Sequence, residues 1–279
     1  MTCFTGVALV LGVFCLAISA EYLEPNCGIG DNPMGFRIFN GTDAQINIHS
    51  WMAYLHTFNR FVCGGTLIHP RFILTAAHCL QPGLKARLGE YDYMTRRDCT
   101  VHGCSPRSEE HDIDMYIPHG YFSLKTGAND IALLRLSQSV EYKEHIKSIC
   151  IILDPWERPY LPYLKHFIAT GWGETGRSRT RGSLQEVTLQ RYAPERCEAR
   201  FTRVLQEDQF CAGSPYGDTC QGDSGGPLGQ SLTHNDETRY VQLGVVSYGS
   251  SECSGVGVYT DVVVHTPWIQ RMVQMYNRK

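Results

Sequence analysis

The sequence predicts an all-β fold that ends in a single helix, and three observations support this prediction. Short apolar runs recur along the chain between Gly, Pro, Asn and Ser residues, which is typical of strands and turns. Only the C-terminus carries a convincing helix pattern. The 12 cysteines and 27 glycines suit a turn-rich body that disulfides stabilise. Together these features indicate a barrel or a sandwich.

The composition sets limits on what this body can be. A chain of 279 residues with 43% apolar and 19% charged side chains can bury a sizeable core, which excludes a disordered or fibrous protein. The formal net charge is −3, so the chain has no basic excess that would attract a phosphate backbone. Nucleic acid is therefore excluded as a partner.

The N-terminus has the pattern of a signal peptide. Every residue from Val7 to Ile18 is apolar or Gly, and Ile18-Ser19-Ala20 offers a small-residue cleavage site. The run is shorter than the roughly 20 apolar residues that a membrane span requires. We expect residues 1–20 to be removed and the protein to be secreted rather than anchored in a membrane. Removal takes Cys3 and Cys15, so ten of the 12 cysteines remain and can form five disulfides.

The elements follow in order along the rest of the chain. The clearest predicted strands cover residues 64–68, 72–74, 131–134 and 241–246. For the C-terminal helix we expect Thr266 as the N-cap and Pro267 at the first helical position. One apolar face of that helix would consist of Trp268, Ile269, Met272, Val273 and Tyr276.

Three short segments carry residues that suit nucleophilic catalysis. His78 lies in Thr75-Ala76-Ala77-His78-Cys79, Asp130 in Asn129-Asp130-Ile131, and Ser224 in Gly222-Asp223-Ser224-Gly225-Gly226-Pro227. Taken singly, each has an ordinary structural interpretation as a His beside a disulfide, an Asp that opens a strand and a Ser in a turn. Taken together, in the order His, Asp, Ser, they match a known arrangement of a hydrolytic triad.

With these motifs the sequence resembles trypsin-like serine endopeptidases of the chymotrypsin family, from Ile38 to the C-terminus. The resemblance implies two packed six-stranded antiparallel β-barrels with a C-terminal helix, and a protease domain of residues 38–279. It implies Ser224 as the nucleophile, His78 as general base and then acid, and Asp130 as the group that orients His78. The N–H groups of Gly222 and Ser224 would form the oxyanion hole.

The resemblance also implies a primary specificity. Asp218 occupies the position of the pocket floor, where a buried carboxylate would pair with Arg or Lys of the substrate. The pocket walls would be Ser247, Tyr248, Gly249 and Gly257. Glu252 stands where the family usually has Gly, and the segment between Cys253 and Gly257 is short, so the rim of the pocket departs from the family pattern.

The segment around Arg37 resembles an activation site. Cleavage after Arg37 would free the amine of Ile38, which would pair with Asp223 and order the site. Residues 21–37 would then be a propeptide and the chain a zymogen. Because the cut follows an Arg, the activating enzyme would itself be trypsin-like, either another protease of a cascade or this enzyme acting on itself.

Five disulfides are implied by the same resemblance. They would join Cys63 to Cys79, Cys197 to Cys211, Cys220 to Cys253, Cys27 to Cys150 and Cys99 to Cys104. The bond from Cys27 to Cys150 would tether the propeptide after activation. The small loop closed by Cys99 and Cys104 resembles an insertion in arthropod clip-domain proteases, although only Cys27 lies between the signal peptide and Arg37, so no clip domain is expected.

The remaining signals concern ligands and partners. Glu90, with Glu109 or Glu110, could coordinate Ca²⁺, but acidic loop residues are more often simply solvated. Asn40-Gly41-Thr42 is a glycosylation sequon. No cofactor is required. The implied partners are protein or peptide substrates, the activating protease and a serpin-type inhibitor, with the protein itself a monomer.

Two other functions compete with this interpretation. A catalytically inactive protease homologue, acting as a secreted binding or cofactor protein, would be recognised by a substituted triad, and here all three residues stand in their motifs. An α/β-hydrolase esterase would place its His last in the chain, whereas His78 comes first. The sequence therefore favours the peptidase.

Overall fold

The computed structural model describes residues 22–29, 42–58, 60–100, 103–153, 163–173, 182–214, 222–234, 237–249 and 255–277. Several predictions lie outside these ranges. They concern the signal peptide, Arg37, Ile38, Asn40, Asp218, Glu252 and the pair Cys220 and Cys253.

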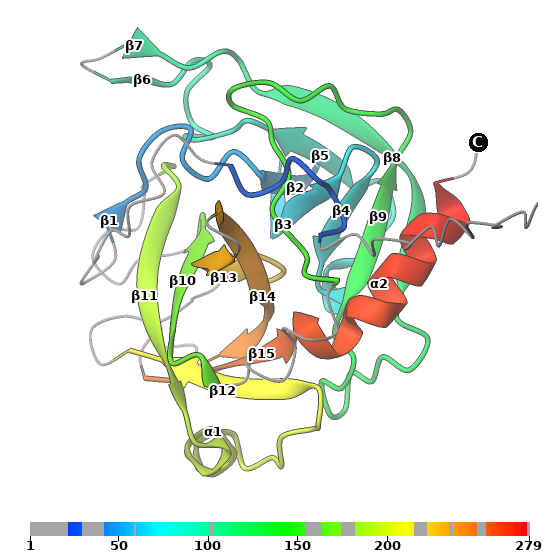
Figure 1. Cartoon of the computed structure of the whole chain (residues 1–279), viewed down its shortest axis with the longest axis vertical. Coiled ribbons are helices and arrows are strands. Elements are labelled where there is room, and N and C mark those ends of the chain that lie inside the picture. The colour runs from blue at the N-terminus through cyan, green and yellow to red at the C-terminus, as the bar shows by residue number, and fades with distance from the viewer. Residues whose placement is uncertain are drawn as a thin grey trace, which may run out of the picture.

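The first half of the chain folds into a closed barrel of six antiparallel strands (Figure 1). The strands, in barrel order, are β2 (Met52–Thr57), β3 (Arg60–His69), β4 (Phe72–Thr75), β9 (Ala132–Leu136), β8 (Glu109–Pro118) and β5 (Lys85–Leu88). Residues 52–56 of β2 and all of β4 are buried, whereas β5 alternates between buried and half-buried positions. The barrel interior is therefore a packed apolar core.

The second half forms a similar ring of six antiparallel strands. Its strands are β11 (Gln185–Tyr192), β10 (His166–Gly171), β13 (Pro227–His234), β14 (Glu237–Gly249), β15 (Gly257–Asp261) and β12 (Gln209–Gly213). Pairing of β11 with β12 closes the ring, and β1 (Thr42–Asp43) adds to the other edge of β11. The predicted pair of six-stranded antiparallel barrels is confirmed.

Shorter elements connect these strands. A 3₁₀ turn, η1 (Ala77–Cys79), follows β4, and the small hairpin β6 (Cys99–Thr100) and β7 (Gly103–Cys104) projects from the first barrel (Figure 1). Helix α1 (Pro194–Phe201) was not expected from the sequence. The helix is short, and the sequence signals that could have predicted it are only Pro194 at its start and the acidic Glu195 in its first turn.

The C-terminal helix α2 (Val262–Tyr276) begins earlier than predicted. Its N-cap is Asp261, whose side chain accepts a hydrogen bond from Val263 N at 2.9 Å, so the expected cap at Thr266 is wrong. Pro267 lies inside the helix rather than at its start. The first turn forms ahead of the proline because Val262 is buried, and Thr266 Oγ1 donates to the Val262 carbonyl at 3.2 Å. The predicted apolar face does pack against the first barrel.

Four of the five implied disulfides are present. They join Cys27 to Cys150, Cys63 to Cys79, Cys99 to Cys104 and Cys197 to Cys211. The fifth pair, Cys220 and Cys253, lies outside the described residues.

The segment of residues 22–29 docks against both barrels, with Leu23 packed on the core of the first and Gly28 bonded to β14 of the second. Cys27 is fully buried, and Gly28 N donates to the Ser148 carbonyl at 2.8 Å. Tyr240 N in β14 donates in turn to the Gly28 carbonyl at 3.0 Å. The disulfide to Cys150 is thus one of several bonds that hold this segment in place.

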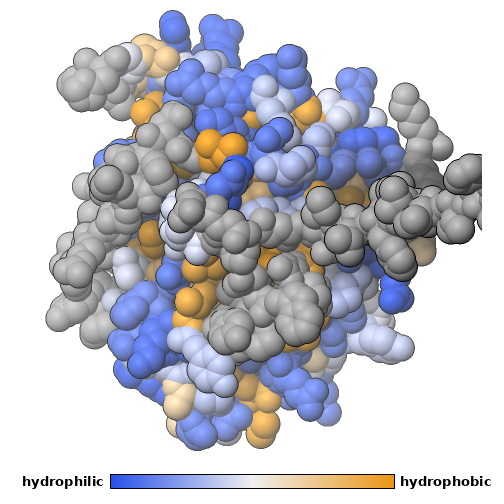
Figure 2. Space-filling view, viewed as in Figure 1, coloured by the Kyte–Doolittle hydropathy of each residue, from blue (hydrophilic) through white to orange (hydrophobic). Residues whose placement is uncertain are grey.

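Among the helices of the described ranges, none combines the length and apolarity that crossing a bilayer requires. The face seen in Figure 2 is mostly polar, with apolar side chains scattered singly or in small groups.

Candidate active site

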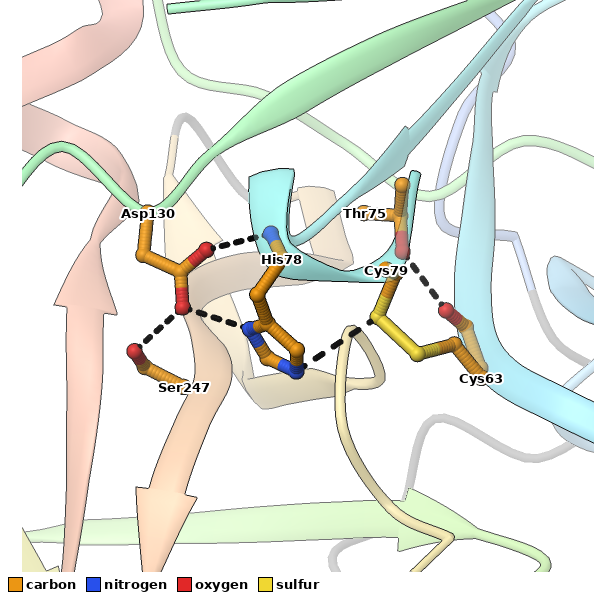
Figure 3. The surroundings of a disulfide bond; sticks show 7 residues. Cys63, Thr75, His78, Cys79, Asp130 and Ser247 are labelled. Carbon is orange, nitrogen blue, oxygen red and sulfur yellow. Dashed lines mark hydrogen bonds and ion pairs between the residues drawn. A yellow bond between two sulfur atoms is a disulfide. The ribbon is translucent and has the colours of Figure 1, made fainter. Parts of the chain in front are cut away.

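His78 is placed by the turn that ends β4. The η1 turn reverses the chain directly after Thr75, and the neighbouring Cys79 is bonded to Cys63 in β3. Ala77 and Cys79 are buried, whereas the imidazole of His78 keeps 28% of its surface exposed. The disulfide and the buried neighbours therefore fix the backbone, while the imidazole remains partly exposed beside Asp130 (Figure 3).

Asp130 is almost fully buried beside this ring. Its Oδ1 accepts from His78 N at 3.0 Å, and its Oδ2 lies 2.7 Å from His78 Nδ1. Only 4% of its side chain is exposed. A buried carboxylate with these partners favours a proton on Nδ1, which leaves Nε2 as the basic nitrogen of His78. Both hydrogen bonds are drawn in Figure 3.

Ser247 completes the set of donors around Asp130. Its Oγ donates to Asp130 Oδ2 at 2.5 Å (Figure 3). Ser247 lies at a bulge of β14, where the pairing register with β15 shifts between Val246 and Tyr248. A bulge turns a side chain away from its regular direction, and here it directs the hydroxyl to the carboxylate. The sequence had suggested Ser247 only as a wall of the specificity pocket.

Ser224 lies in a turn between Gly222 and Gly225, two positions whose backbone conformation requires glycine. Gly222 and Gly225 have φ values of 100° and 77°, in the left-handed region. A side chain at Gly225 would also collide with Thr75 Oγ1 and the Gly64 carbonyl. The Ser224 carbonyl accepts from Gly64 N at 2.8 Å, so the turn from the second barrel is bonded directly to β3 of the first.

Asp223 packs beneath the segment that follows β10. Its Oδ1 accepts from Gly173 N at 2.9 Å. A Cβ atom at Gly173 would lie 2.5 Å from the carboxyl carbon of Asp223, so a side chain there would displace the Asp223 carboxylate. Ile38, the predicted partner of Asp223, lies outside the described residues.

The predicted pocket is described in part. Gly249 pairs with Gly257 at the ends of β14 and β15, and Tyr248 pairs with Val258. A Cβ atom at Gly257 would come within 2.9 Å of the Tyr259 hydroxyl, so this position is tightly packed. The structure thus brings Ser247, Tyr248, Gly249 and Gly257 together, while the predicted floor at Asp218 and rim at Glu252 lie outside the described ranges.

The acidic residues considered for Ca²⁺ have protein cations as partners. Glu90 is buried and its carboxylate lies 3.2 Å from Arg87, with a further hydrogen bond from Ser108. Burial raises the pKa of Glu90, against the opposing effect of Arg87. Glu110 pairs with Lys85 at 2.9 Å, and Glu109 with Lys143 at 2.6 Å. These residues fit an ion-pair network better than a calcium site.

One group of metal-type ligands occurs within the described part of the chain. It consists of Cys63, His78 and Cys79. The two sulfurs are joined to each other, so neither can act as the thiolate that a metal would need. His78 Nε2 lies 3.7 Å from Cys79 Sγ, which is a weak acceptor at most.

Several residues that support the site were missed by the sequence interpretation. Thr75 Oγ1 donates to the Gly64 carbonyl at 2.8 Å, and Thr260 Oγ1 donates to the Asp130 carbonyl at 3.0 Å. Asp208 accepts from Asn129 N at 2.6 Å. Asp208 and Thr260 lie in no motif, and Thr75 lies in the His78 motif without any sign of its role, because the partners of all three are backbone atoms brought close only by the fold.

Comparison with known proteins places this geometry in a family. The family model described as Trypsin matches residues 38–269. The chain is 34% identical over 266 residues to "Serine protease grass" of Drosophila melanogaster, covering 88% of this chain and 69% of that one. It is 36% identical over 272 residues to "CLIP domain-containing serine protease HP8" of Bombyx mori, covering 88% and 71%.

Solved structures agree with the sequence comparison. The Drosophila Grass clip serine protease of the Toll pathway superposes with a TM-score of 0.79 at 32% identity, over 89% of this chain and 75% of that one. Neuropsin, a serine protease of mouse brain, gives a TM-score of 0.69 at 27% identity, over 85% of this chain and all of that one. The double barrel, the site and these matches lead to one conclusion: the chain belongs to the trypsin family of serine proteases.

Proposed function

We propose that the chain is the secreted zymogen of an endopeptidase that cleaves after Arg or Lys, with Ser224, His78 and Asp130 as its triad. The observation that carries this proposal is the buried Asp130 carboxylate, which holds both His78 Nδ1 and the His78 backbone N–H. This arrangement leaves the second ring nitrogen basic and partly exposed. The glycine-flanked turn of Ser224 is bonded to the same barrel that carries His78.

The chemistry follows from these positions. Ser224 Oγ attacks the scissile carbonyl carbon while His78 Nε2 takes its proton, and Asp130 stabilises the imidazolium that forms. Breakdown of the tetrahedral intermediate expels the amine, which receives the proton from His78 and leaves an acyl-enzyme. Water then attacks the acyl carbon while His78 Nε2 takes its proton; the bond to Ser224 Oγ breaks, Oγ regains the proton from His78, and the carboxylic acid product leaves. Donors from Gly222 N and Ser224 N would stabilise the oxyanion, each worth about 3 to 4 kcal/mol.

Specificity would reside in Asp218. An apolar side chain in the pocket would leave that carboxylate desolvated and unpaired, which costs several kcal/mol, on the order of a thousandfold in rate. Arg should be preferred to Lys, because its guanidinium can bind the carboxylate through two parallel hydrogen bonds. Glu252 at the rim would favour basic residues further along the substrate by less than about 1 kcal/mol, because solvent screens an exposed charge.

Activation would follow cleavage after Arg37. The freed amine of Ile38 would pair with Asp223, whose carboxylate already contacts Gly173 beside the Ser224 turn. Relatives include "Phenoloxidase-activating factor 3" of Holotrichia diomphalia, whose name describes an activator of another protein. On that basis we propose that this chain takes protein substrates, is activated by a trypsin-like protease and meets a serpin-type inhibitor. Secretion and glycosylation at Asn40 belong to the same proposal.

The decisive experiment measures amide hydrolysis by protein cleaved after Arg37. Matched Arg, Lys and Phe peptide amides are compared for wild type, Ser224→Ala, Asp130→Asn and Asp218→Ser. We expect Ser224→Ala and Asp130→Asn to lose nearly all activity, and Asp218→Ser to lose only the basic preference. A cleaved wild-type protein that binds peptides without hydrolysing them would instead identify an inactive homologue.

A second experiment separates activation from catalysis. Arg37→Gln should remain inactive after exposure to a trypsin-like activator, because the Ile38 amine is never released. If the uncut variant hydrolysed arginyl amides at the rate of the cleaved protein, the zymogen proposal would be wrong and the triad proposal would stand.

A further inference from the structure

A second His–carboxylate pair lies behind the loop that carries Asp130. Asp208, directly before β12, accepts from Asn129 N through its Oδ2 at 2.6 Å. His265 in α2 places its Nε2 3.2 Å from the same oxygen. The side chains of His265 and Asp208 are only 5% and 10% exposed. The pair therefore belongs to the interior rather than to the substrate cleft.

Asn129 needs the support that this pair provides. Its φ of 54° lies in the left-handed region, which costs a non-glycine residue on the order of 1 kcal/mol. Its own side chain contributes one weak contact, from Nδ2 to the Tyr121 carbonyl at 3.3 Å. The strong contact is the one from its backbone N–H to Asp208. The Asn129 carbonyl also accepts from Ile131 N at 2.8 Å, within the same loop. Asp208 is therefore the restraint on Asn129 that comes from the second barrel.

The backbone after Asn129 is held on the other side. The Asp130 carbonyl accepts from Thr260 Oγ1, which is fully buried in β15. Asp208 and β15 are themselves joined, because Asp261 N donates to the Asp208 carbonyl at 2.8 Å. The Asn129–Asp130 segment is thus held between Asp208 and Thr260, which lie on two segments of the second barrel that are hydrogen-bonded to each other, and His78 approaches from the first barrel.

We propose that Asp208, with Thr260 opposite, is a positioning residue that fixes the Asn129–Asp130 backbone so that the Asp130 carboxylate meets His78 Nδ1. The proposal rests on the proposed triad, since Asp208 acts only through Asp130. It predicts that loss of the Asp208 acceptor alters the chemistry at His78 and not merely the stability of the fold.

The charges around the pair are consistent with an ionised Asp208. Burial alone would raise the pKa of Asp208, but the hydrogen bonds from His265 and the Asn129 amide hold this pKa below its usual value. His119 faces His265 with ring centroids 5.0 Å apart, and burial and His265 lower the pKa of His119. Asp261 also interacts with His265 and with Arg191, and burial raises the pKa of Asp261.

The test compares Asp208→Ala with Asp208→Asn in the cleaved protein. The alanine removes the acceptor, whereas the asparagine keeps an amide oxygen for Asn129 N. We expect Asp208→Ala to lower kcat by about tenfold to a hundredfold with little change in KM, because a displacement of about 1 Å at a catalytic group has effects of this order. Asp208→Asn should restore most of the loss.

The pH profile provides a readout that a purely structural role would not change. The acid limb of kcat/KM reports ionisation of the free enzyme, here of His78. A displaced Asp130 stabilises the His78 imidazolium less, so the limb should move to lower pH in Asp208→Ala and return toward wild type in Asp208→Asn. Rates are normalised to the concentration of active sites, which is measured with a covalent active-site titrant. Unfolded protein therefore does not lower the measured kcat.

The matched control is another buried His–carboxylate pair. His49 Nε2 lies 2.7 Å from Glu186 Oε2 in β11, and no contact joins this pair to the Asn129 or Asp130 side of the described structure. Glu186→Ala should lower the Tm without moving the acid limb. If Asp208→Ala cannot be folded, Thr260→Val removes the opposite restraint with little change of shape, and it should shift the acid limb in the same direction.

Four results distinguish the possible failures. The inference would be overturned if Asp208→Ala, with its active sites counted, kept the wild-type kcat and the wild-type acid limb. If Asp208→Ala does not fold, an unchanged acid limb in Thr260→Val would overturn it as well. Equal shifts of the limb in Asp208→Ala and Glu186→Ala would overturn it too, since the effect would then be one of stability. Full activity in Asp130→Asn would instead show that the proposed triad itself is wrong.

Discussion

At the scale of single residues, the site depends on how many donors surround one buried carboxylate. Asp130 accepts from two nitrogens of His78 and from Ser247 Oγ. Hydrogen bonds to a charged group contribute roughly 1.5 to 3 kcal/mol each. Ser247 is the one donor that can be removed without touching the proposed reacting groups.

Ser247→Ala should therefore lower kcat/KM on an arginyl amide on the order of tenfold, because Asp130 Oδ2 loses a donor in a buried setting. Steady-state kinetics of the cleaved protein measure the effect. Ser105→Ala is a suitable control, since Ser105 Oγ donates to Asn47 Oδ1 at 2.8 Å, outside the site. An unchanged rate in Ser247→Ala would mean that this bond contributes nothing to the function of Asp130.

At the scale of elements, three segments meet at His69, the last residue of β3. Arg71 N donates to His69 Nδ1 at 3.1 Å, and Glu24 and Asn277 lie 3.6 Å and 3.4 Å from His69 Nε2. Burial, with a smaller effect of Arg71, lowers the pKa of His69 from 6.5 to about 4. The folded protein thus keeps His69 neutral where the unfolded chain would bind a proton.

This difference predicts a stability that falls as the pH falls from 6.5 toward 4, since the unfolded state binds more protons in that window. Above pH 6.5 the contribution is fully present. His69→Asn, which keeps an acceptor for Arg71 N, should flatten the slope of the unfolding free energy in this window. Denaturant unfolding of both proteins at several pH values tests it. Burial raises the pKa of Glu24, and this makes the folded state more stable as the pH falls, opposite to the effect of His69. The slope of His69→Asn must therefore be compared with the slope of the wild type.

The disulfides differ in the length of chain that they close. Cys27 and Cys150 are separated by 123 residues, whereas Cys99 and Cys104 are separated by 5. In the chain-entropy model these loops correspond to about 5 and about 2 kcal/mol. In the uncut chain, removing Cys27 and Cys150 together should therefore lower the unfolding free energy much more than removing Cys99 and Cys104. Equal losses in chemical denaturation would contradict this expectation.

The sequence predicted the elements whose signals are local. Apolar runs bounded by turn residues identified β3, β4, β9 and β14, and the motifs around His78, Asp130 and Ser224 identified the candidate site. It missed α1 and the true start of α2, because a Pro267 that looked like a helix start is tolerated inside a helix already capped by Asp261. It also missed Asp208 and Thr260, whose partners are backbone atoms distant in the chain.

At the scale of the whole molecule, the two barrels are joined by buried polar contacts as well as by apolar packing. Thr66 Oγ1 in β3 donates to Gln242 Oε1 in β14 at 2.6 Å, and both residues are almost fully buried. Gly64 and Ser224 form a second contact of this kind nearby. These hydrogen bonds therefore fix the position of one barrel relative to the other beside the candidate site.

Thr66→Val should cost about 1 to 3 kcal/mol of stability, because Gln242 Oε1 would be left buried without its donor. Thr66→Ser keeps the hydroxyl and should cost clearly less. Equilibrium unfolding, followed by probes in both barrels, measures the two losses. If the valine and serine variants were equally stable, the hydroxyl would have no role in joining the barrels.

The clamp on Asp130 also has a consequence for the timing of synthesis. Asp130 is made more than a hundred residues before Ser247 and Thr260, which bind its carboxylate and carbonyl. A nascent chain that has completed only the first barrel contains His78 and Asp130 but none of these restraints, and it lacks Ser224. Under the proposed triad, hydrolytic competence therefore cannot precede translation of Ser224, and the restraints on Asp130 are complete only once β15 has been made.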